Sequence, residues 1–231
     1  MNTLKAIQVL PNLYQIKHSD PGSIRAGMAT NTYILMANGK ALIIDAAFDY
    51  LLEPIKEVLG TKFTVVGFLY SHNHVVGNSN FLQGYKEAFD VPFFLHPLDA
   101  AAFGTQGAGY FENPINHLLL AEFNIDIKLF QGHTKGSVII HQAENDGLII
   151  AGDAAMGATD GQALEGIERL IRVPTQMSYS DETIRQNWIN WNLPVAHFAA
   201  YHGVAYYNKK EEMPEIMKLL TREQETVSLY G

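Results

Sequence analysis

Histidine and aspartate residues occur at four separate places in the chain, each next to a glycine or at the end of an apolar run. His72 and His74 are separated by one residue, and His133, Asp153 and His202 each adjoin a glycine. Imidazole nitrogens and carboxylate oxygens are the ligands that divalent metals such as zinc take from proteins. These five residues are therefore the candidate ligands of a metal centre.

The local sequence decides whether the histidine pair is a site or a coincidence. Nine histidines occur in 231 residues, so a chance H-x-H pair is common and carries little weight alone. The segment 63–70, FTVVGFLY, has the composition of a buried strand, and the pair follows directly after it. A structural histidine more often lies within such a run, so the position favours a functional site.

Apolar runs and turn residues predict alternating strands and helices. The expected strands are 7–18, 32–36, 41–46, 63–70, 91–95, 123–130, 137–142 and 148–151, the last two joined by a turn at 144–147. The expected helices are 50–59, 81–89, one opened by a capping box of Ser178 and Asp181 and running to about 191, and one with Pro214 in its first turn. Two strand-rich halves, each closed by helices, predict an α/β (α+β) helix/sheet/sheet/helix sandwich.

The order of five motifs resembles the metallo-β-lactamase-fold hydrolase superfamily over most of the chain. The motifs are NTYIL at 31–35 with ALIIDAA at 41–47, SHNH at 71–74, QGHTKGS at 131–137, LIIAGD at 148–153 and YHG at 201–203. The resemblance implies a four-layer αβ/βα sandwich of two mixed β-sheets. It also implies that Asp153 bridges toward a second metal and that His202 is the last ligand.

The chain departs from the family pattern directly after His74. The family continues H-x-H with x-Asp-His and then x-Gly-Gly-Asn, whereas this chain reads HVVGN at 74–78. A gapped alignment leaves the x-Asp-His residues out, and an ungapped one places Val76 and Gly77 at the aspartate and histidine positions. In both alignments two ligands of the second metal are missing.

The ligands that remain imply a single zinc ion held by His72, His74 and His133, with Asp153 completing or hydrogen-bonding its coordination sphere. Three imidazoles and an open water position suffice for a catalytic zinc. The implied reaction is hydrolysis of a small ester, lactone or thioester by a metal-bound hydroxide, with Asp153 and His202 as catalytic residues and His202 protonating the leaving group. Asp45, at the end of a strand, is expected to orient the ligand loop from behind.

Two other function classes stay open. His72, His133 and Asp153 could instead hold one iron ion, as in persulfide dioxygenases that resemble this chain. The missing aspartate and histidine would also suit a non-catalytic relative that binds a ligand without turnover. Metal content separates these alternatives, because a complete ligand set normally retains its ion.

Composition limits the partners and the compartment. A chain of 231 residues that is 47% hydrophobic can bury one core, so a single domain over 1–231 is expected. A net charge of −8 without a basic cluster argues against nucleic acid and leaves a small molecule as the expected partner. The absence of an apolar span or leader pattern predicts a cytoplasmic protein without a membrane partner. Association into a homo-oligomer is left open.

Two loops could shape the access of a substrate. Arg25, in the loop 19–30, could meet a carboxylate, and Tyr110 and Phe111, in the Gly-rich segment 105–116, could cover an apolar substrate. Ordinary surface loops are the equally weighted alternative. His96, His141 and His197 are expected to be structural, and Trp188 and Trp191 to belong to the core or to a dimer face.

Overall fold

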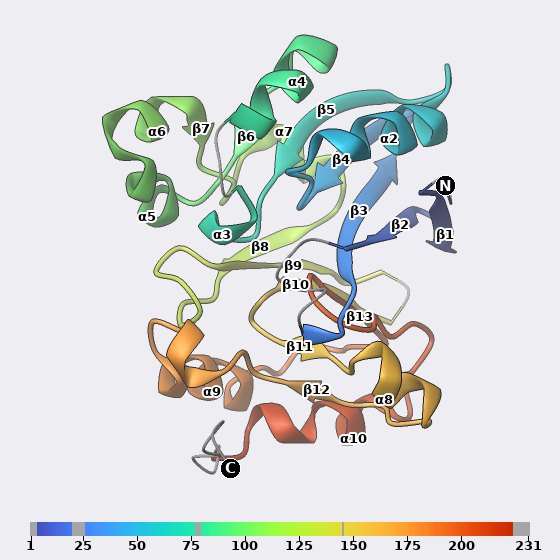
Figure 1. Cartoon of the computed structure of the whole chain (residues 1–231), viewed down its shortest axis with the longest axis vertical. Coiled ribbons are helices and arrows are strands. Elements are labelled where there is room, and N and C mark those ends of the chain that lie inside the picture. The colour runs from blue at the N-terminus through green and yellow to red at the C-terminus, as the bar shows by residue number, and fades with distance from the viewer. Residues whose placement is uncertain (1–3, 20–25, 77–79, 145, 224–231) are drawn as a thin grey trace.

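Two β-sheets packed face to face, with helices on both outer sides, make up the fold (Figure 1). The computed structural model describes residues 4–19, 26–76, 80–144 and 146–223. This arrangement confirms the predicted four-layer sandwich. None of the helices in these ranges is both long and apolar enough to cross a bilayer.

The first sheet is built by the N-terminal half of the chain. Its strands, in spatial as well as chain order, are β1 (Ala6–Leu10), β2 (Leu13–His18), β3 (Thr30–Ala37), β4 (Lys40–Ile44), β5 (Thr64–Leu69), β6 (Phe93–Phe94) and β7 (Phe111–Glu112). The pairs from β1 to β4 are antiparallel, and those from β4 to β7 are parallel. The parallel strands β4 and β5 therefore present their carboxyl ends at the same edge, where His72 follows.

The second sheet is built by the C-terminal half. Its order is β13 (His197–Ala200), β10 (Leu148–Gly152), β9 (Val138–Gln142) and β8 (Asp126–Leu129), and β10 is parallel to β13. A short ribbon pairs β11 (Met156–Gly157) with β12 (Leu170–Ile171). Because β10 and β13 run in the same direction, Asp153 and His202 leave the sheet at one edge.

Helices connect the strands and cover the outer faces. In the first half they are η1 (Asp49–Leu51), α2 (Leu52–Leu59), α3 (Asn73–Val76), α4 (Asn80–Phe89), α5 (Pro97–Ala100), η2 (Ala101–Phe103) and α6 (Gly104–Tyr110). In the second half they are α7 (Leu118–Ala121), α8 (Asp160–Leu164), η3 (Thr175–Met177), α9 (Asp181–Ile189), α10 (Met213–Met217) and η4 (Lys218–Leu220).

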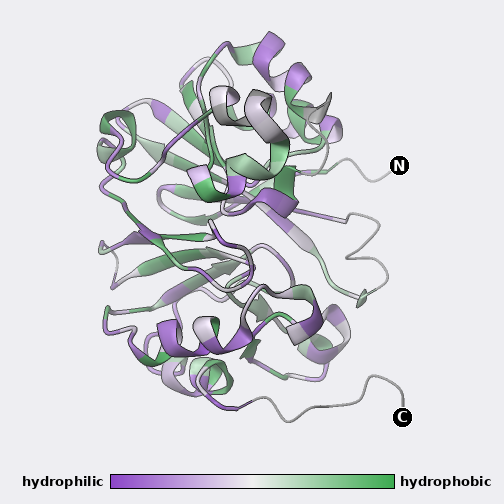
Figure 2. Cartoon of the chain, turned by 90° about the vertical axis from the view of Figure 1, so that its left-hand side faces the viewer, coloured by the Kyte–Doolittle hydropathy of each residue, from purple (hydrophilic) through white to green (hydrophobic). Residues whose placement is uncertain are grey.

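Three apolar clusters correspond to the three interfaces between the four layers. The central cluster joins the sheets and contains Leu35 and Ile44 of the first sheet with Ile140 and Ile150 of the second. A second cluster packs α2 and α4 on the first sheet, and a third packs α9 and α10 on the second. Figure 2 shows the strands of both sheets largely green and the outer helices carrying purple. This is the pattern expected where apolar burial holds the layers together.

The structure differs from the sequence prediction at three places. The predicted strand 7–18 is a hairpin, because Pro11 and Asn12 form a two-residue turn between Leu10 and Leu13. The predicted loop 105–116 contains the helix α6 and the edge strand β7. Helix α9 is capped by the side chain of Ser180, not Ser178. The end of α2 at Gly60 and Pro214 in the first turn of α10 are confirmed.

Asn31 links the two sheets through its side-chain amide. It is fully buried on β3, and its Nδ2 donates to the carbonyl oxygens of Gly203 at 2.8 Å and Ala200 at 3.0 Å. Its Oδ1 accepts from Gln15 Nε2 at 2.7 Å. The amide thereby fixes the end of β13, from which His202 extends, against the first sheet.

We expect Asn31→Ala to destabilise the chain by roughly 2–3 kcal/mol, because two buried hydrogen-bonding partners lose their bonds to the amide. Denaturant unfolding should show this loss. Gln8→Ala is the control, since Gln8 makes an exposed bond to the Pro11 carbonyl and its loss should leave stability nearly unchanged. Equal effects of the two substitutions would contradict the assigned role of Asn31.

Candidate metal centre

Strand ends bring the candidate ligands to one edge of the sandwich. His72 follows β5, His74 lies in the short helix α3, and His133 lies in the loop between β8 and β9. Asp153 follows β10 directly, and His202 follows β13 by two residues. The fold therefore collects five side chains that are spread over 131 positions of the sequence.

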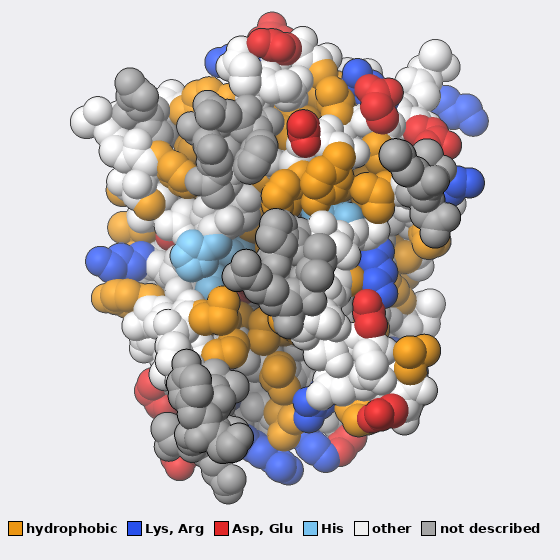
Figure 3. Space-filling model, viewed as in Figure 1, with side chains coloured by type: hydrophobic (Ala, Val, Ile, Leu, Met, Phe, Trp, Pro, Cys, Tyr) orange, Lys and Arg blue, Asp and Glu red, His pale blue; other side chains and the backbone are white. Residues whose placement is uncertain are grey.

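The three histidines of the first-metal set converge. One ring nitrogen from each of His72, His74 and His133 lies within 4.8 Å of the others. His74 Nδ1 is 2.9 Å from His133 Nε2. Ligands on a tetrahedral zinc at 2.0–2.1 Å stand about 3.3 Å apart, so this spacing suits one shared ion. Figure 3 shows histidine side chains reaching the surface, consistent with the exposure of His74, whereas His72 and His133 are buried.

Asp153 lies beside the triad and pairs with His202. Its Oδ1 accepts from His202 Nδ1 at 2.8 Å. Its Oδ2 faces His72 Nε2 at 3.5 Å and His133 Nε2 at 3.7 Å, both longer than a normal hydrogen bond. The carboxylate thus connects the triad to His202 without filling the hydrogen-bonding capacity of the triad.

The electrostatic environment keeps imidazoles neutral and the carboxylate charged. Burial, reinforced by the neighbouring His72, lowers the pKa of His133 to about 3. Burial and His72 also lower the pKa of His74. Burial opposes ionisation of Asp153, but His202 and then His72 outweigh it and hold the pKa of Asp153 well below its usual value. Neutral imidazoles and an ionised carboxylate are the forms that bind a metal.

One buried nitrogen supports the fit to a metal directly. His72 Nε2 is buried and has no hydrogen-bond partner, while the other ring nitrogen, Nδ1, bonds Ser71 Oγ at 2.9 Å. Leaving a buried polar atom unpaired costs about 1–3 kcal/mol, so such atoms are rare unless they serve a ligand. The unpaired nitrogen lies 3.5 Å from Asp153 Oδ2, which is itself 3.7 Å from His133 Nε2.

Asp45 bonds the backbone at the end of the strand that precedes His72, and its role in orienting the ligands stays a prediction. It is 1% exposed, and its Oδ1 accepts from the Ser71 backbone N–H at 2.7 Å. Burial raises the pKa of Asp45 to about 6, although His72 and the Ser71 bond favour ionisation. Gly152 packs against the same serine, since a Cβ there would lie 2.3 Å from Ser71 Oγ.

Asp99 connects the two histidine loops and was not identified from the sequence. Its Oδ2 accepts from the Asn73 N–H at 2.9 Å and from Thr134 Oγ1 at 2.6 Å, and its Oδ1 accepts from the Gly136 N–H at 2.7 Å. Asp99 is 1% exposed, and Gly136 has no room for a side chain beside it. One carboxylate thereby binds the residue before His74 and two residues that follow His133.

Other predicted residues lie apart from this cluster or outside the described residues. Tyr110 stacks on Phe93 and Phe111 packs edge-on against Tyr70, so both pack on the first sheet, and their contact with substrate stays a prediction. Arg25 lies outside the described residues.

The remaining histidines have structural partners, as expected. His96 Nδ1 caps α5 by accepting from the Leu98 N–H, and His197 Nδ1 accepts from the Asn208 N–H. His141 packs on Trp191, which belongs to the third core cluster with Trp188.

Comparison with known proteins shows the fold clearly and the sequence relationship weakly. No protein-family model matches the sequence. A curated relative, described as an uncharacterized protein of Aquifex aeolicus (strain VF5), is 30% identical over 144 residues, which are 54% of this chain and 64% of the relative. This chain therefore spans somewhat less than two thirds of that relative.

Solved structures match nearly the whole chain. The DIM-1 metallo-β-lactamase aligns with a TM-score of 0.69 at 13% identity, covering 94% of this chain and 95% of that one. A metallo-β-lactamase from Erythrobacter litoralis gives 0.65 at 13% identity over 95% and 92%. The BLEG-1 B3 metallo-β-lactamase gives 0.56 at 19% identity over 87% and 96%. The chain has the metallo-β-lactamase fold. Its identity to these structures is 13–19%, so it is a divergent example of that fold, and it carries a histidine cluster that could hold a metal.

The two residues after His74 are part of the core. Val75 and Val76 are 3% and 0% exposed and belong to the apolar cluster under the first sheet. Val76 occupies the aspartate position in the ungapped alignment, and Gly77 lies outside the described residues. An apolar side chain at position 76 supplies no metal ligand.

We expect Asp99→Asn to weaken metal binding about 10–100-fold, the range for partners that orient ligands from behind. The amide would direct its NH2 group at donors that now bond a carboxylate oxygen. Competition with a chelator measures the affinity. Asp160→Asn is the matched control, because Asp160 forms an exposed pair with Lys17. Unchanged affinity in Asp99→Asn would contradict the linking role.

We expect the stability of the metal-free chain to depend on Asp45 and pH. A carboxyl whose pKa rises on folding loses stability as it ionises, so the cost is absent below pH 3.8 and complete above about pH 6. That difference in pKa is worth about 3 kcal/mol. The free energy of unfolding of Asp45→Asn, measured relative to that of the wild type, should therefore rise by up to about 3 kcal/mol between pH 3.5 and pH 7.5. A pH-independent difference would show that Asp45 titrates normally.

Proposed function

We propose that this chain is a hydrolase that uses one zinc ion to cleave a small ester, lactone or thioester. The observation that carries the proposal is the convergence of His72, His74 and His133 within 4.8 Å, with His72 Nε2 buried and unpaired. The hydrolase-type fold supports the reaction class. The ester, lactone or thioester rests on analogy with the fold and is the part that substrate screening must decide.

A single ion is favoured by the ligands that are present. The triad offers three imidazoles, enough for a catalytic zinc with an open position. A second ion could be bound only by Asp153 and His202. The aspartate and histidine that follow the H-x-H pair in the family pattern are absent from this sequence. Two ligands are too few for tight binding of a second ion.

The residues divide into those that hold the ion and those that move protons. His72, His74 and His133 would hold the zinc, with Asp153 beside them. A bound zinc lowers the pKa of its water to about 7 and polarises a scissile carbonyl. His202 donates Nδ1–H to Asp153, which fixes its tautomer, so Nε2 is the ring atom through which it would exchange a proton with the leaving group.

A second candidate is a mononuclear iron oxygenase. It is favoured by the position of Asp153 Oδ2, 3.5 Å from His72 Nε2 and 3.7 Å from His133 Nε2, because two histidines and a carboxylate form the facial set of non-haem iron oxygenases. This assignment would leave His74 without a role as a ligand. Oxygen uptake by iron-loaded protein, compared with ester hydrolysis by zinc-loaded protein, separates the two candidates.

We expect His133→Ala to lose the metal and the hydrolysis of ester, lactone and thioester substrates together. Elemental analysis of protein purified without added ions measures metal per chain, and chromogenic esters and thioesters measure turnover. His117→Ala is the matched control, since His117 caps α7 and pairs with Glu112. Full metal occupancy in His133→Ala would overturn the ligand assignment, and a metal-loaded wild type inactive on all three substrate classes would overturn the proposed reaction.

A further inference from the structure

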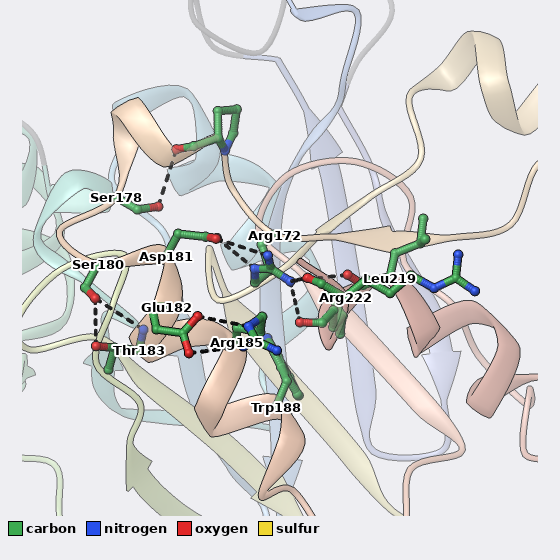
Figure 4. A network of polar contacts seen from close by, with 12 residues as sticks. Arg172, Ser178, Ser180, Asp181, Glu182, Thr183, Arg185, Trp188, Leu219 and Arg222 are labelled. Atoms are coloured by element: carbon green, nitrogen blue, oxygen red, sulfur yellow. Dashed lines mark hydrogen bonds and ion pairs between the residues drawn. The ribbon is translucent and has the colours of Figure 1, made fainter. Parts of the chain in front are cut away.

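A fully buried arginine joins three separate segments behind the His133 loop. Arg172, which follows β12, has no exposed side-chain surface. Figure 4 shows its guanidinium between Asp181, at the start of α9, and the C-terminal residues Leu219 and Arg222. Burying an arginine costs free energy unless the N–H groups of its guanidinium find acceptors.

The contacts of Arg172 satisfy that requirement in two directions. Nε and Nη2 donate to the two carboxylate oxygens of Asp181 at 2.7 and 3.0 Å, the two-point geometry that makes such pairs strong. Nη1 lies 2.6 Å from the Leu220 carbonyl, 2.8 Å from that of Arg222 and 3.3 Å from that of Leu219. The C-terminal segment 219–222 and the first turn of α9 are therefore fixed to one group.

The segment leading into α9 lies directly against the metal-ligand loop. The Tyr179 N–H donates to the His133 carbonyl at 3.0 Å, and the Ser180 N–H donates to the Gly132 carbonyl at 2.7 Å. Gly132 has a φ of +137°, and a Cβ there would lie 2.3 Å from Ile184 of α9. These backbone bonds thus fix the position of His133 relative to the start of α9.

We propose that Arg172 is a positioning residue for His133, and that the C-terminal segment 219–222 is part of the metal-site architecture. Arg172 fixes Asp181 and the C-terminal carbonyls, Asp181 fixes the start of α9, and residues 179 and 180 hold the Gly132–His133 backbone. The inference rests on the proposed metal-binding role of His133.

Arg185 provides a matched control on the same helix. It pairs with Glu182 at 2.9 Å and lies 3.3 Å from the Thr221 carbonyl, so it also touches the C-terminal segment. Its partner Glu182 also lies in the first turn of α9, but the Glu182 side chain is 63% exposed, so this is a surface pair, unlike the buried bonds of Arg172. A general effect of loosening α9 or the C-terminal segment should appear in Arg185→Met as well.

The experiment compares Arg172→Met, Asp181→Asn and Arg185→Met as full-length chains. Amide hydrogen exchange at Tyr179 and Ser180 is measured on metal-free protein, and zinc affinity is measured by chelator competition. We expect exchange at both amides to accelerate at least tenfold and zinc affinity to fall about tenfold in the first two variants, with little change in Arg185→Met. Asp181→Asn keeps the contacts of Arg172 to the C-terminal carbonyls, so it decides the question if Arg172→Met does not fold.

The two readouts separate this inference from the proposed function. If Asp181→Asn leaves both amides and the zinc affinity unchanged, Arg172 does not position His133. If Arg185→Met has the same effects as Asp181→Asn, the effect is general and the inference is overturned. If the wild type binds no metal, the proposed function fails, while the exchange of the two amides still decides whether Arg172 fixes the loop.

Discussion

The candidate site depends on a buried carboxylate that accepts hydrogen bonds from two separate loops. Asp99 binds the Asn73 N–H, Thr134 Oγ1 and the Gly136 N–H. Together with the backbone bond from the Val138 N–H to the Ser71 carbonyl at 2.9 Å, these bonds hold the segment after β5 against the loop before β9. The position of His74 relative to His133 is therefore set from behind by an acceptor that neither loop contains.

The electrostatics of the site oppose the stability of the metal-free chain. Three imidazoles converge, two of them buried, and two of their nitrogens, His72 Nε2 and His133 Nδ1, have no hydrogen-bond partner. Asp45 is ionised at neutral pH despite a pKa raised to about 6 by burial. These groups cost free energy when the chain folds without a ligand, and a bound cation offsets that cost because it replaces the missing partner. Strain of this kind is typical of a binding site and is not expected of a purely structural cluster.

The four layers and the histidine cluster could be predicted because short stretches of the sequence carry the signal for both. Apolar runs such as 63–70 end directly before the residues that carry the chemistry, so the edge of the sandwich could be located. Asp99 could not be predicted in the same way, since it lies 25 positions from His74 and 34 from His133 and follows an ordinary helix start at Pro97. Its role depends on how α5 packs, and packing across the chain has no local signal.

The same distinction explains the errors in secondary structure. The turn at Pro11 and Asn12 interrupts an apolar pattern that otherwise reads as one strand, and it joins residues that pair across the hairpin. Helix α6 forms in a glycine-rich segment that propensity alone disfavours, and its last residue, Tyr110, packs against the core cluster of the first sheet. Either Ser178 or Ser180 could cap the helix on sequence grounds. In the structure Ser178 ends η3, and Ser180 is the residue that caps α9.

Asp153 and His202 form a hydrogen-bonded pair beside the histidine triad. Their 2.8 Å bond keeps a buried carboxylate ionised, because a neighbouring donor outweighs the cost of burying the charge. The pair is therefore self-sufficient and does not need a second ion to be stable. Val76 packs into the core and offers no ligand, so the proposal of one ion beside this pair rests on the three histidines alone.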